Sequence, residues 1–207
     1  WLKKVGYSAE WIVKKAAEEG TLVHEMIEDW LNGKEITFLY DNGNPKMPAH
    51  VWQMFLRFVD FWETYKPTLI EAEVHLFSDK IEVAGTCDLV CEIEIDGKME
   101  RWIIDFKTSN HLQTTYDLQG AIYAQCYEEC YGKDIDRVAV LWLKSKSRGP
   151  DKSGKRIKGK NWEIYESPRT QEQNIEIFTH VKALFDIENP KPTPYTSTFQ
   201  TTSKRVK

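Results

Sequence analysis

The chain has 207 residues, 41% of them hydrophobic and eight of them Trp, which is enough apolar surface for one sizeable folded domain and excludes a disordered chain. No apolar run approaches the roughly 20 residues needed to cross a bilayer, so no membrane partner is expected. The net charge of −4 excludes a nucleic-acid binder only if the charges are spread evenly along the chain, and they are segregated.

The first helix is predicted over residues 16–31, where apolar residues repeat at helical spacing until Asn32-Gly33 ends the run. His24 lies on this helix, and a single helical histidine is more often a surface or core residue than a metal ligand. Residues 1–4 are not followed by the apolar stretch of a signal peptide, which favours a cytoplasmic protein.

A second helix is predicted over residues 48–65, followed by three strands at about 69–77, 82–95 and 99–107. Asp96-Gly97 predicts a hairpin between the last two strands. Alternation along the middle strand separates two sets of residues, Cys87, Leu89, Cys91, Ile93 and Ile95 on one face and Asp88, Val90, Glu92 and Glu94 on the other. Gly85, just before Asp88, allows a bend or a close approach of another segment.

The third strand carries an acid and a base two residues apart, Asp105 and Lys107. Since side chains alternate along a strand, both point the same way, with their Cα atoms about 7 Å apart. Trp102, Ile104 and Phe106 take the other face and can enter a core. Taken alone, such a pair is more often a partly exposed ion pair that contributes little to stability.

A helix follows over residues 115–131, with Gln119 and Tyr123 one turn apart on one face. Residues 137–143 alternate as a buried strand. Because a helix connects this strand to the earlier ones, the crossover rule predicts that it lies parallel to one of them.

The segment 144–160 carries eight basic residues against the single acid Asp151, a net charge of +7, so the rest of the chain carries −11. The basic residues are Lys144, Lys146, Arg148, Lys152, Lys155, Arg156, Lys158 and Lys160. This excess favours phosphate contact with a steep salt dependence, and the alternative is a solvated loop. We expect a basic loop or hairpin over 144–166, a helix over 170–187 and an extended C-terminal arm over 189–207.

The four cysteines form two pairs at i, i+4 spacing, Cys87 with Cys91 and Cys126 with Cys130. On a strand the first pair would lie about 13 Å apart, too far to share one tetrahedral ion. The second pair lies in an apolar helical stripe, where cysteine behaves as a small hydrophobe. We therefore expect buried free thiols rather than a zinc or iron–sulfur site.

In their order along the chain, these residues resemble the PD-(D/E)XK nuclease superfamily, and within it the RecB-like branch that includes phage lambda-type exonucleases. The matching segments are GTLVHEMIE, EAEVHL, GTCD, IIDFKTS and QGAIY, which span residues 20–123. The helix and strand that follow extend the resemblance to about residue 143. One departure is that the acid before the lysine is Asp105, where the RecB-like branch commonly has Glu. In some relatives, cysteines that bind an iron–sulfur cluster flank the core; all four here lie inside it.

The resemblance implies a role for each matching residue. His24, Asp88, Asp105 and the backbone carbonyl of Phe106 would hold Mg²⁺ or Mn²⁺, with Glu73 in a supporting role or at a second metal. Asp88, Asp105 and Lys107 would be catalytic, Lys107 by polarising the attacking water or stabilising charge on the phosphate. Gln119 and Tyr123 would contact DNA near the scissile phosphate. Oxygen ligands favour Mg²⁺ or Mn²⁺, and a histidine shifts the preference towards Mn²⁺.

The implied fold is α/β, a restriction-endonuclease-like core over residues 1–188 in a single domain. Its central mixed sheet combines an antiparallel meander with a parallel strand after a crossover helix, and helices flank it. The implied activity is metal-dependent hydrolysis of single- or double-stranded DNA, with an exonuclease of phage or bacterial recombination and repair favoured, acting in a bacterial cell or an infected host. A homo-oligomer or a recombination partner protein is compatible with this role. The alternatives are a structure-specific or restriction-type endonuclease and a catalytically silent nucleic-acid-binding subunit.

Overall fold

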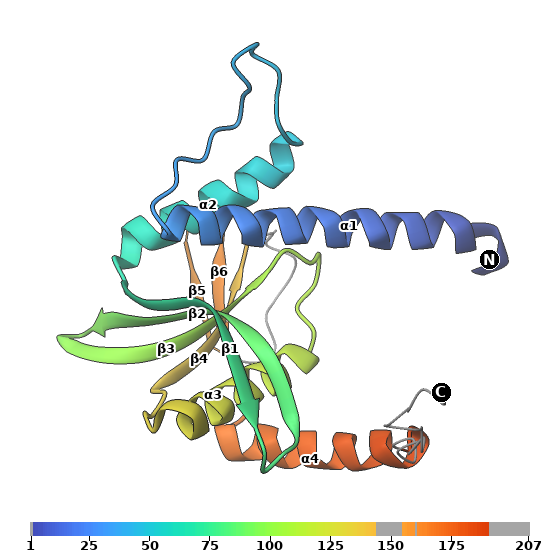
Figure 1. Ribbon diagram of the computed structural model, residues 1–207, viewed down its shortest axis with the longest axis vertical. Helices are drawn as coiled ribbons and strands as arrows, with labels where there is room; N and C mark the ends of the chain where they lie inside the picture. The colour runs from blue at the N-terminus through green and yellow to red at the C-terminus, as the bar shows by residue number, and fades with distance from the viewer. Residues whose placement is uncertain (1, 144–154, 160, 191–207) are drawn as a thin grey trace, which may run out of the picture.

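A six-stranded mixed β-sheet lies between two layers of helices in the computed structural model, which describes residues 2–143, 155–159 and 161–190 (Figure 1). The strands are β1 (Thr68–Ser78), β2 (Val83–Ile95), β3 (Lys98–Lys107), β4 (Arg137–Trp142), β5 (Lys155–Lys158) and β6 (Glu163–Glu166). The helices are α1 (Leu2–Leu31), α2 (Ala49–Tyr65), α3 (Thr115–Tyr131) and α4 (Gln171–Glu188). This architecture confirms the predicted α/β class with a mixed sheet flanked by helices.

The strands follow the order β1-β2-β3-β4-β6-β5 across the sheet. β1, β2 and β3 pair antiparallel as the predicted meander. The hairpin between β2 and β3 turns at Asp96 and Gly97, which both have positive φ (51° and 79°), as a type I′ turn requires. β4 follows α3 and pairs parallel with β3, while β5 and β6 extend the sheet as an antiparallel hairpin. The crossover helix thus delivers the parallel strand that the sequence predicts.

α1 and α2 cover one face of the sheet, over the larger of two hydrophobic cores (Figure 1). Val23 and Ile27 of α1 and Phe58 and Phe61 of α2 are almost completely buried. The sheet contributes alternate residues of β2, β3 and β4 to this core, namely Leu89, Cys91, Ile93, Trp102, Ile104, Phe106, Ala139 and Leu141. Each fully buried side chain of this size contributes about 1.5–3 kcal/mol through burial, so the core holds α1 firmly against the sheet.

α3 packs on the opposite face of the sheet, and α4 packs on α3 (Figure 1). The second core on this face includes Val74, Leu76, Cys87, Val90, Ile103, Tyr123, Ala124, Cys126 and Tyr127. Gly120 lets α3 approach β4 closely, because a Cβ atom at that position would lie 2.5 Å from Val138 Cγ1. This close packing fixes the height of α3 over the parallel strand pair.

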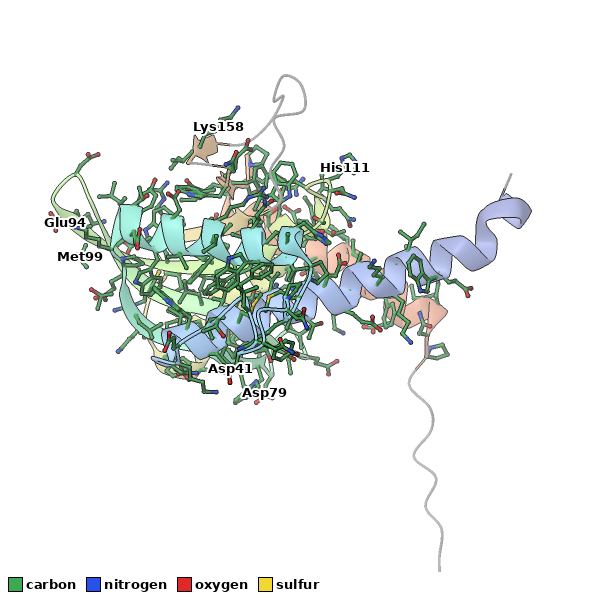
Figure 2. The ribbon with its side chains drawn as sticks, turned by 90° about the horizontal axis from the view of Figure 1, so that it is seen from above. Asp41, Asp79, Glu94, Met99, His111 and Lys158 are labelled. Carbon is green, nitrogen blue, oxygen red and sulfur yellow. The ribbon has the colours of Figure 1, made fainter. Side chains whose placement is uncertain are left out.

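α1 is longer than predicted, since it begins at Leu2 rather than near residue 16. Residues 10–18 are exposed, so this part of the helix has no apolar face against the sheet that periodicity could reveal. Helix-forming residues and the ion pair between Lys14 and Glu18 (3.9 Å) support it locally. In Figure 2 this part of α1 extends beyond the sheet, away from Glu94 and Met99 at the hairpin of β2 and β3.

The predicted alternation of β2 holds from Leu89 to Ile93 but is wrong at Cys87. Cys87 packs into the second core together with Val90, although strict alternation would place it with Leu89. At this point of the sheet Ala72 pairs with Leu89 and Val74 with Cys87, so Glu73 lies opposite Asp88. Glu73, at the point where the faces exchange, has a φ of 52°, a conformation rare for a residue other than glycine.

All four cysteines lie in the described residues and none forms a disulfide; Cys87, Cys91 and Cys126 are buried and Cys130 is partly exposed. In the described part of the chain, no helix is long and apolar enough to cross a membrane. Of the predicted basic residues, Lys144, Lys146, Arg148, Lys152 and Lys160 lie outside the described residues, as does most of the C-terminal arm.

Candidate active site

The candidate site lies where β2 and β3 separate. The antiparallel pairing of these strands extends from Ile95–Lys98 to Leu89–Ile104. Beyond that pair, the backbone N–H of Phe106 donates a hydrogen bond to Asp88 Oδ2 at 2.6 Å. A side chain thus satisfies a backbone donor at the place where the two strands diverge, and Asp88, only 8% exposed, is fixed in orientation.

His24 reaches this point from α1. Its Nδ1 atom lies 3.2 Å from Asp88 Oδ1, so the two oxygens of Asp88 serve two different partners. The His24 ring also packs edge-on against Phe106, with 5.7 Å between ring centroids. One turn earlier, Gly20 brings α1 close to the end of β3, because a Cβ atom there would lie 3.0 Å from Thr108 Oγ1. This close approach sets the height of His24 over the strands.

His24, Glu73 and Asp88 each offer a ligand atom, and these atoms all lie within 4.8 Å of one another. They come from α1 and from the consecutive strands β1 and β2. The unusual backbone conformation of Glu73 accompanies its place in this group. Non-glycine residues in this conformation are often found at functional sites, because the surrounding structure must offset the strain.

Asp105 and Lys107 point to the same side of β3, as the sequence predicts. Lys107 Nζ lies 2.5 Å from Asp105 Oδ2, and both side chains are largely buried. The contact is a buried ion pair, and the Lys107 ammonium is the charged partner of Asp105 Oδ2. Asp105 is not a member of the group formed by His24, Glu73 and Asp88.

α3 supplies the other side of the site. Lys107 Nζ donates to Gln119 Oε1 at 3.0 Å, and Gln119 Nε2 donates to the Tyr123 hydroxyl at 2.9 Å. Gly85 makes room for Tyr123, since a Cβ atom at Gly85 would lie 2.9 Å from Tyr123 Cε1. The close approach expected at this glycine is therefore present, and the approaching group is the side chain of Tyr123.

The carboxylates of the site disturb one another electrostatically. Burial and the neighbouring charge of Asp88 raise the pKa of Asp105 to about 6, although Lys107 opposes this shift. Burial and the charge of Asp88 also raise the pKa of Glu73. Burial by itself lowers the pKa of His24, but its hydrogen bond with Asp88 and the surrounding carboxylates raise the pKa above its usual value. The cluster therefore holds more negative charge than its own cations balance.

A cavity of about 590 Å³ opens beside these groups. His24, Glu73, Phe106 and Lys107 line it together with small residues and two glutamates of α1 (Glu25 and Glu28), the loop that follows β3, and Tyr116. A set of carboxylates with one imidazole suits a divalent cation with a preference for oxygen. The repulsion between these carboxylates, which raises the pKa values of Asp105 and Glu73, is what such a cation would relieve, so the residues present fit a divalent metal.

The structure groups His24, Glu73 and Asp88 at one point and joins Asp105, Lys107, Gln119 and Tyr123 in a chain of contacts between β3 and α3. Phe106 contacts Asp88 through its backbone N–H, whereas the sequence predicts its carbonyl as a ligand. Sequence reasoning missed Tyr116, whose ring lies under the Lys107 ammonium at 4.7 Å from Nζ to the centroid. Its position three residues before Gln119, on the same face of α3, was the available signal. In the basic segment, Lys158 lies in β5, 4.0 Å from Glu163, and the backbones of Lys155 and Arg156 lie in the same strand.

A buried ion pair beside a carboxylate–histidine cluster, at the diverging end of a mixed sheet, is an arrangement that suits metal-dependent hydrolysis on an α/β fold. A family model of the PD-(D/E)XK nuclease superfamily matches residues 6–198, nearly the whole chain. The chain belongs to this superfamily, and membership implies a nuclease that uses divalent metal ions and acts on DNA. No curated protein matched the chain in a search of such sequences.

Proposed function

We propose that this protein is a deoxyribonuclease that hydrolyses phosphodiester bonds with Mg²⁺ or Mn²⁺, through a site centred on His24 and Asp88. The observation that carries the proposal is the convergence of the His24–Glu73–Asp88 group with the Asp105–Lys107 pair across the diverging ends of β2 and β3. Residues 1–188 would form a single catalytic domain.

The metal ligands in this proposal are His24 and Asp88 at the centre, flanked by Asp105 and the Phe106 carbonyl on β3 and by Glu73 on β1. The ligand atom of Glu73 lies within 4.8 Å of those of His24 and Asp88. This distance supports Glu73 as a direct metal ligand, beyond the supporting role that the sequence suggests. The histidine favours Mn²⁺ alongside Mg²⁺. A bound divalent ion would supply positive charge for the phosphoryl oxygens and lower the pKa of an attacking water.

Lys107 would act on the reacting phosphate. Its ammonium is aligned by Gln119 and lines the cavity in which the phosphate would lie. From there it can donate to a phosphoryl oxygen and stabilise the negative charge that develops during attack, or orient the attacking water. Because Asp105 is only 4% exposed, it keeps this cation next to the metal ligands rather than in solvent.

DNA would contact the protein near α3 and along the basic segment. Gln119 is placed beside Lys107 and is partly exposed, whereas Tyr123 is only 9% exposed. We therefore propose that Gln119 lies next to the scissile phosphate and that Tyr123 acts through it. The eight basic residues of 144–160 would contact the DNA backbone away from the reacting bond.

The resemblance to the RecB-like branch favours an exonuclease of phage or bacterial recombination and repair, working in the cytoplasm of the bacterium or the infected host. Such a role is compatible with a homo-oligomer or a recombination partner protein. The runner-up is a structure-specific or restriction-type endonuclease.

Incubation of the protein with linear and covalently closed circular DNA, each with Mg²⁺, Mn²⁺ or EDTA, tests the proposal. We expect degradation of linear DNA with either metal and none with EDTA. Cleavage of closed circular DNA would show that the protein is an endonuclease and not an exonuclease. Binding without cleavage under every metal condition would contradict the catalytic proposal and leave a silent DNA-binding subunit.

Lys107→Ala tests whether Lys107 acts in the chemical step and not in binding. It should lower kcat about 100- to 1,000-fold, the loss expected when one group that stabilises developing charge is removed. DNA affinity and Mn²⁺ affinity should remain near those of the wild type. Weakened Mn²⁺ binding in this variant would assign Lys107 a different role.

A further inference from the structure

We propose that Tyr116 is a positioning residue whose aromatic face holds the Lys107 ammonium in place. The inference rests on the proposed function of Lys107, and it concerns a residue outside the motifs that define the site. Lys107 Nζ lies 4.7 Å from the centroid of the Tyr116 ring, within the distance of a cation–π interaction.

Lys107 has to be held on several sides, because lysine is a point charge on a flexible four-carbon stem. Asp105 contacts its ammonium at 2.5 Å and Gln119 at 3.0 Å, and the Tyr116 ring closes a further side. The Lys107 side chain is 18% exposed as a result. Two of the three partners belong to α3, so this helix holds the Lys107 side chain of β3 in position.

The three partners differ in what they can do when the site is loaded. Asp105 is also a proposed metal ligand, and a carboxylate drawn towards a divalent ion attracts the ammonium less. Gln119 is a proposed neighbour of the DNA and can exchange its hydrogen bond. The ring of Tyr116 binds no hard cation such as Mg²⁺ or Mn²⁺ as a ligand. Its attraction for Lys107 therefore persists in both states of the site.

Tyr116 is itself fixed in orientation. Its hydroxyl donates to Ser109 Oγ at 3.2 Å, and the Ser109 carbonyl accepts a hydrogen bond from Trp142 Nε1 at 2.7 Å. These contacts tie the start of α3 to the loop after β3 and to the end of β4. Since Tyr116 and Gln119 are three residues apart on α3, they face Lys107 from one side of the helix.

Two substitutions separate the ring from the hydroxyl. Tyr116→Phe keeps the aromatic face and removes the hydrogen bond to Ser109, whereas Tyr116→Leu removes the face. We expect kcat within about threefold of the wild type for Tyr116→Phe and a fall of about 3- to 30-fold for Tyr116→Leu, the range expected from one cation–π contact. KM and Mn²⁺ affinity should change little in either variant. Tyr131→Leu, at the far end of α3, is the control and should keep wild-type kinetics.

A readout that needs neither metal nor activity comes from NMR of the protein in EDTA. The ε-methylene protons of Lys107, lying over the ring, should be shifted upfield in the wild type and in Tyr116→Phe, and should return to ordinary values in Tyr116→Leu. An unshifted Lys107 signal in the wild type would overturn the positioning role, even if the protein cleaves DNA.

The kinetics supply a second test, and they distinguish this inference from the proposed function. A wild type that cleaves no DNA would end the nuclease proposal while leaving the NMR test intact. In an active enzyme, a Tyr116→Leu variant with raised KM and unchanged kcat would show that Tyr116 contacts the substrate instead. Unchanged kinetics together with an unchanged Lys107 signal would also overturn the inference.

Discussion

Asp88 and Phe106 are joined by a 2.6 Å hydrogen bond from the Phe106 backbone N–H to Asp88 Oδ2, at the point where the pairing of β2 with β3 has ended. Asp88 thereby has two tasks: one oxygen satisfies the backbone of β3 and the other faces His24 at 3.2 Å. The same carboxylate therefore affects both the stability of the fold and the proposed metal site.

Replacing Asp88 by Ala and by Asn separates these tasks, because both changes remove the charge but only Asn keeps an oxygen acceptor. We expect Asp88→Ala to be less stable than Asp88→Asn by about 1–3 kcal/mol, the effect of a buried N–H left without a partner. Urea unfolding in EDTA measures this difference. Equal stability of the two variants would show that the Phe106 hydrogen bond is dispensable.

Glu73 combines a proposed ligand with a strained backbone, since its φ is 52°. Glu73→Gly and Glu73→Ala both remove the carboxylate, but only glycine adopts this conformation without strain. We expect Glu73→Gly to be the more stable of the two by about 1 kcal/mol, in line with the strain of a non-glycine residue in the left-handed region. Both should bind Mn²⁺ more weakly than the wild type. If thermal unfolding shows Glu73→Ala to be more stable than Glu73→Gly, the backbone at Glu73 is not strained.

Part of this site could be predicted from the sequence because its local geometry is simple. Alternation on β3 places Asp105 and Lys107 together, and helical spacing places Gln119 one turn from Tyr123. The ends of α2 and α4 also match their signals: Pro48 is the N-cap residue of α2, and Thr170 and Gln173 form a capping box on α4. The elements and the crossover topology follow from such patterns.

The rest depends on tertiary packing that no local pattern contains. The contact of His24 with Asp88 requires α1 to cross the sheet at Gly20, and only the resemblance to a known superfamily indicated it. The exchange of faces at Cys87 lies opposite the unusual backbone of Glu73, and the alternation rule foresees neither. Residues 10–18 of α1 are exposed, so periodicity could not detect this part of the helix.

The raised pKa values predict how stability depends on pH. A carboxyl group whose pKa is higher in the folded protein keeps its proton where the unfolded chain loses it, so Asp105, with a pKa of about 6, should lower stability as pH rises from about 4 to 6. His24, whose pKa is also raised, stabilises the fold in its protonated form, and this contribution is lost as pH rises through its folded pKa, above the usual value of about 6.5.

Both effects act in the same direction, so the contribution of Asp105 and His24 to the unfolding temperature in EDTA should fall from pH 4 to pH 7.5. Mn²⁺ needs a neutral His24 and ionised carboxylates, and its stabilising effect should therefore grow over the same range. Melting curves with EDTA and with Mn²⁺ measure the two trends. In Asp105→Asn the fall between pH 4 and 6 should flatten; an undiminished fall would remove Asp105 as its cause.

The basic segment should control the salt dependence of DNA binding. Neutralising Lys155, Arg156 and Lys158 to Gln should weaken binding and reduce the slope of log K against log salt by up to about 0.9 for each phosphate that the variant no longer neutralises. Neutralising Lys34, Lys98 and Lys133, which lie elsewhere on the surface, provides a control of equal charge. Fluorescence anisotropy at several salt concentrations gives both slopes, and equal slopes for the two triple variants would mean that segment 144–160 makes no specific contribution.

The most direct test of the account is anomalous diffraction from crystals of this protein soaked in Mn²⁺. We predict one strong peak in contact with both His24 and Asp88, at about 2.0–2.6 Å from its ligand atoms, on the side of the site where Glu73 and Asp105 converge. Manganese bound elsewhere on an intact protein, with His24 and Asp88 still facing each other and no ion between them, would contradict it.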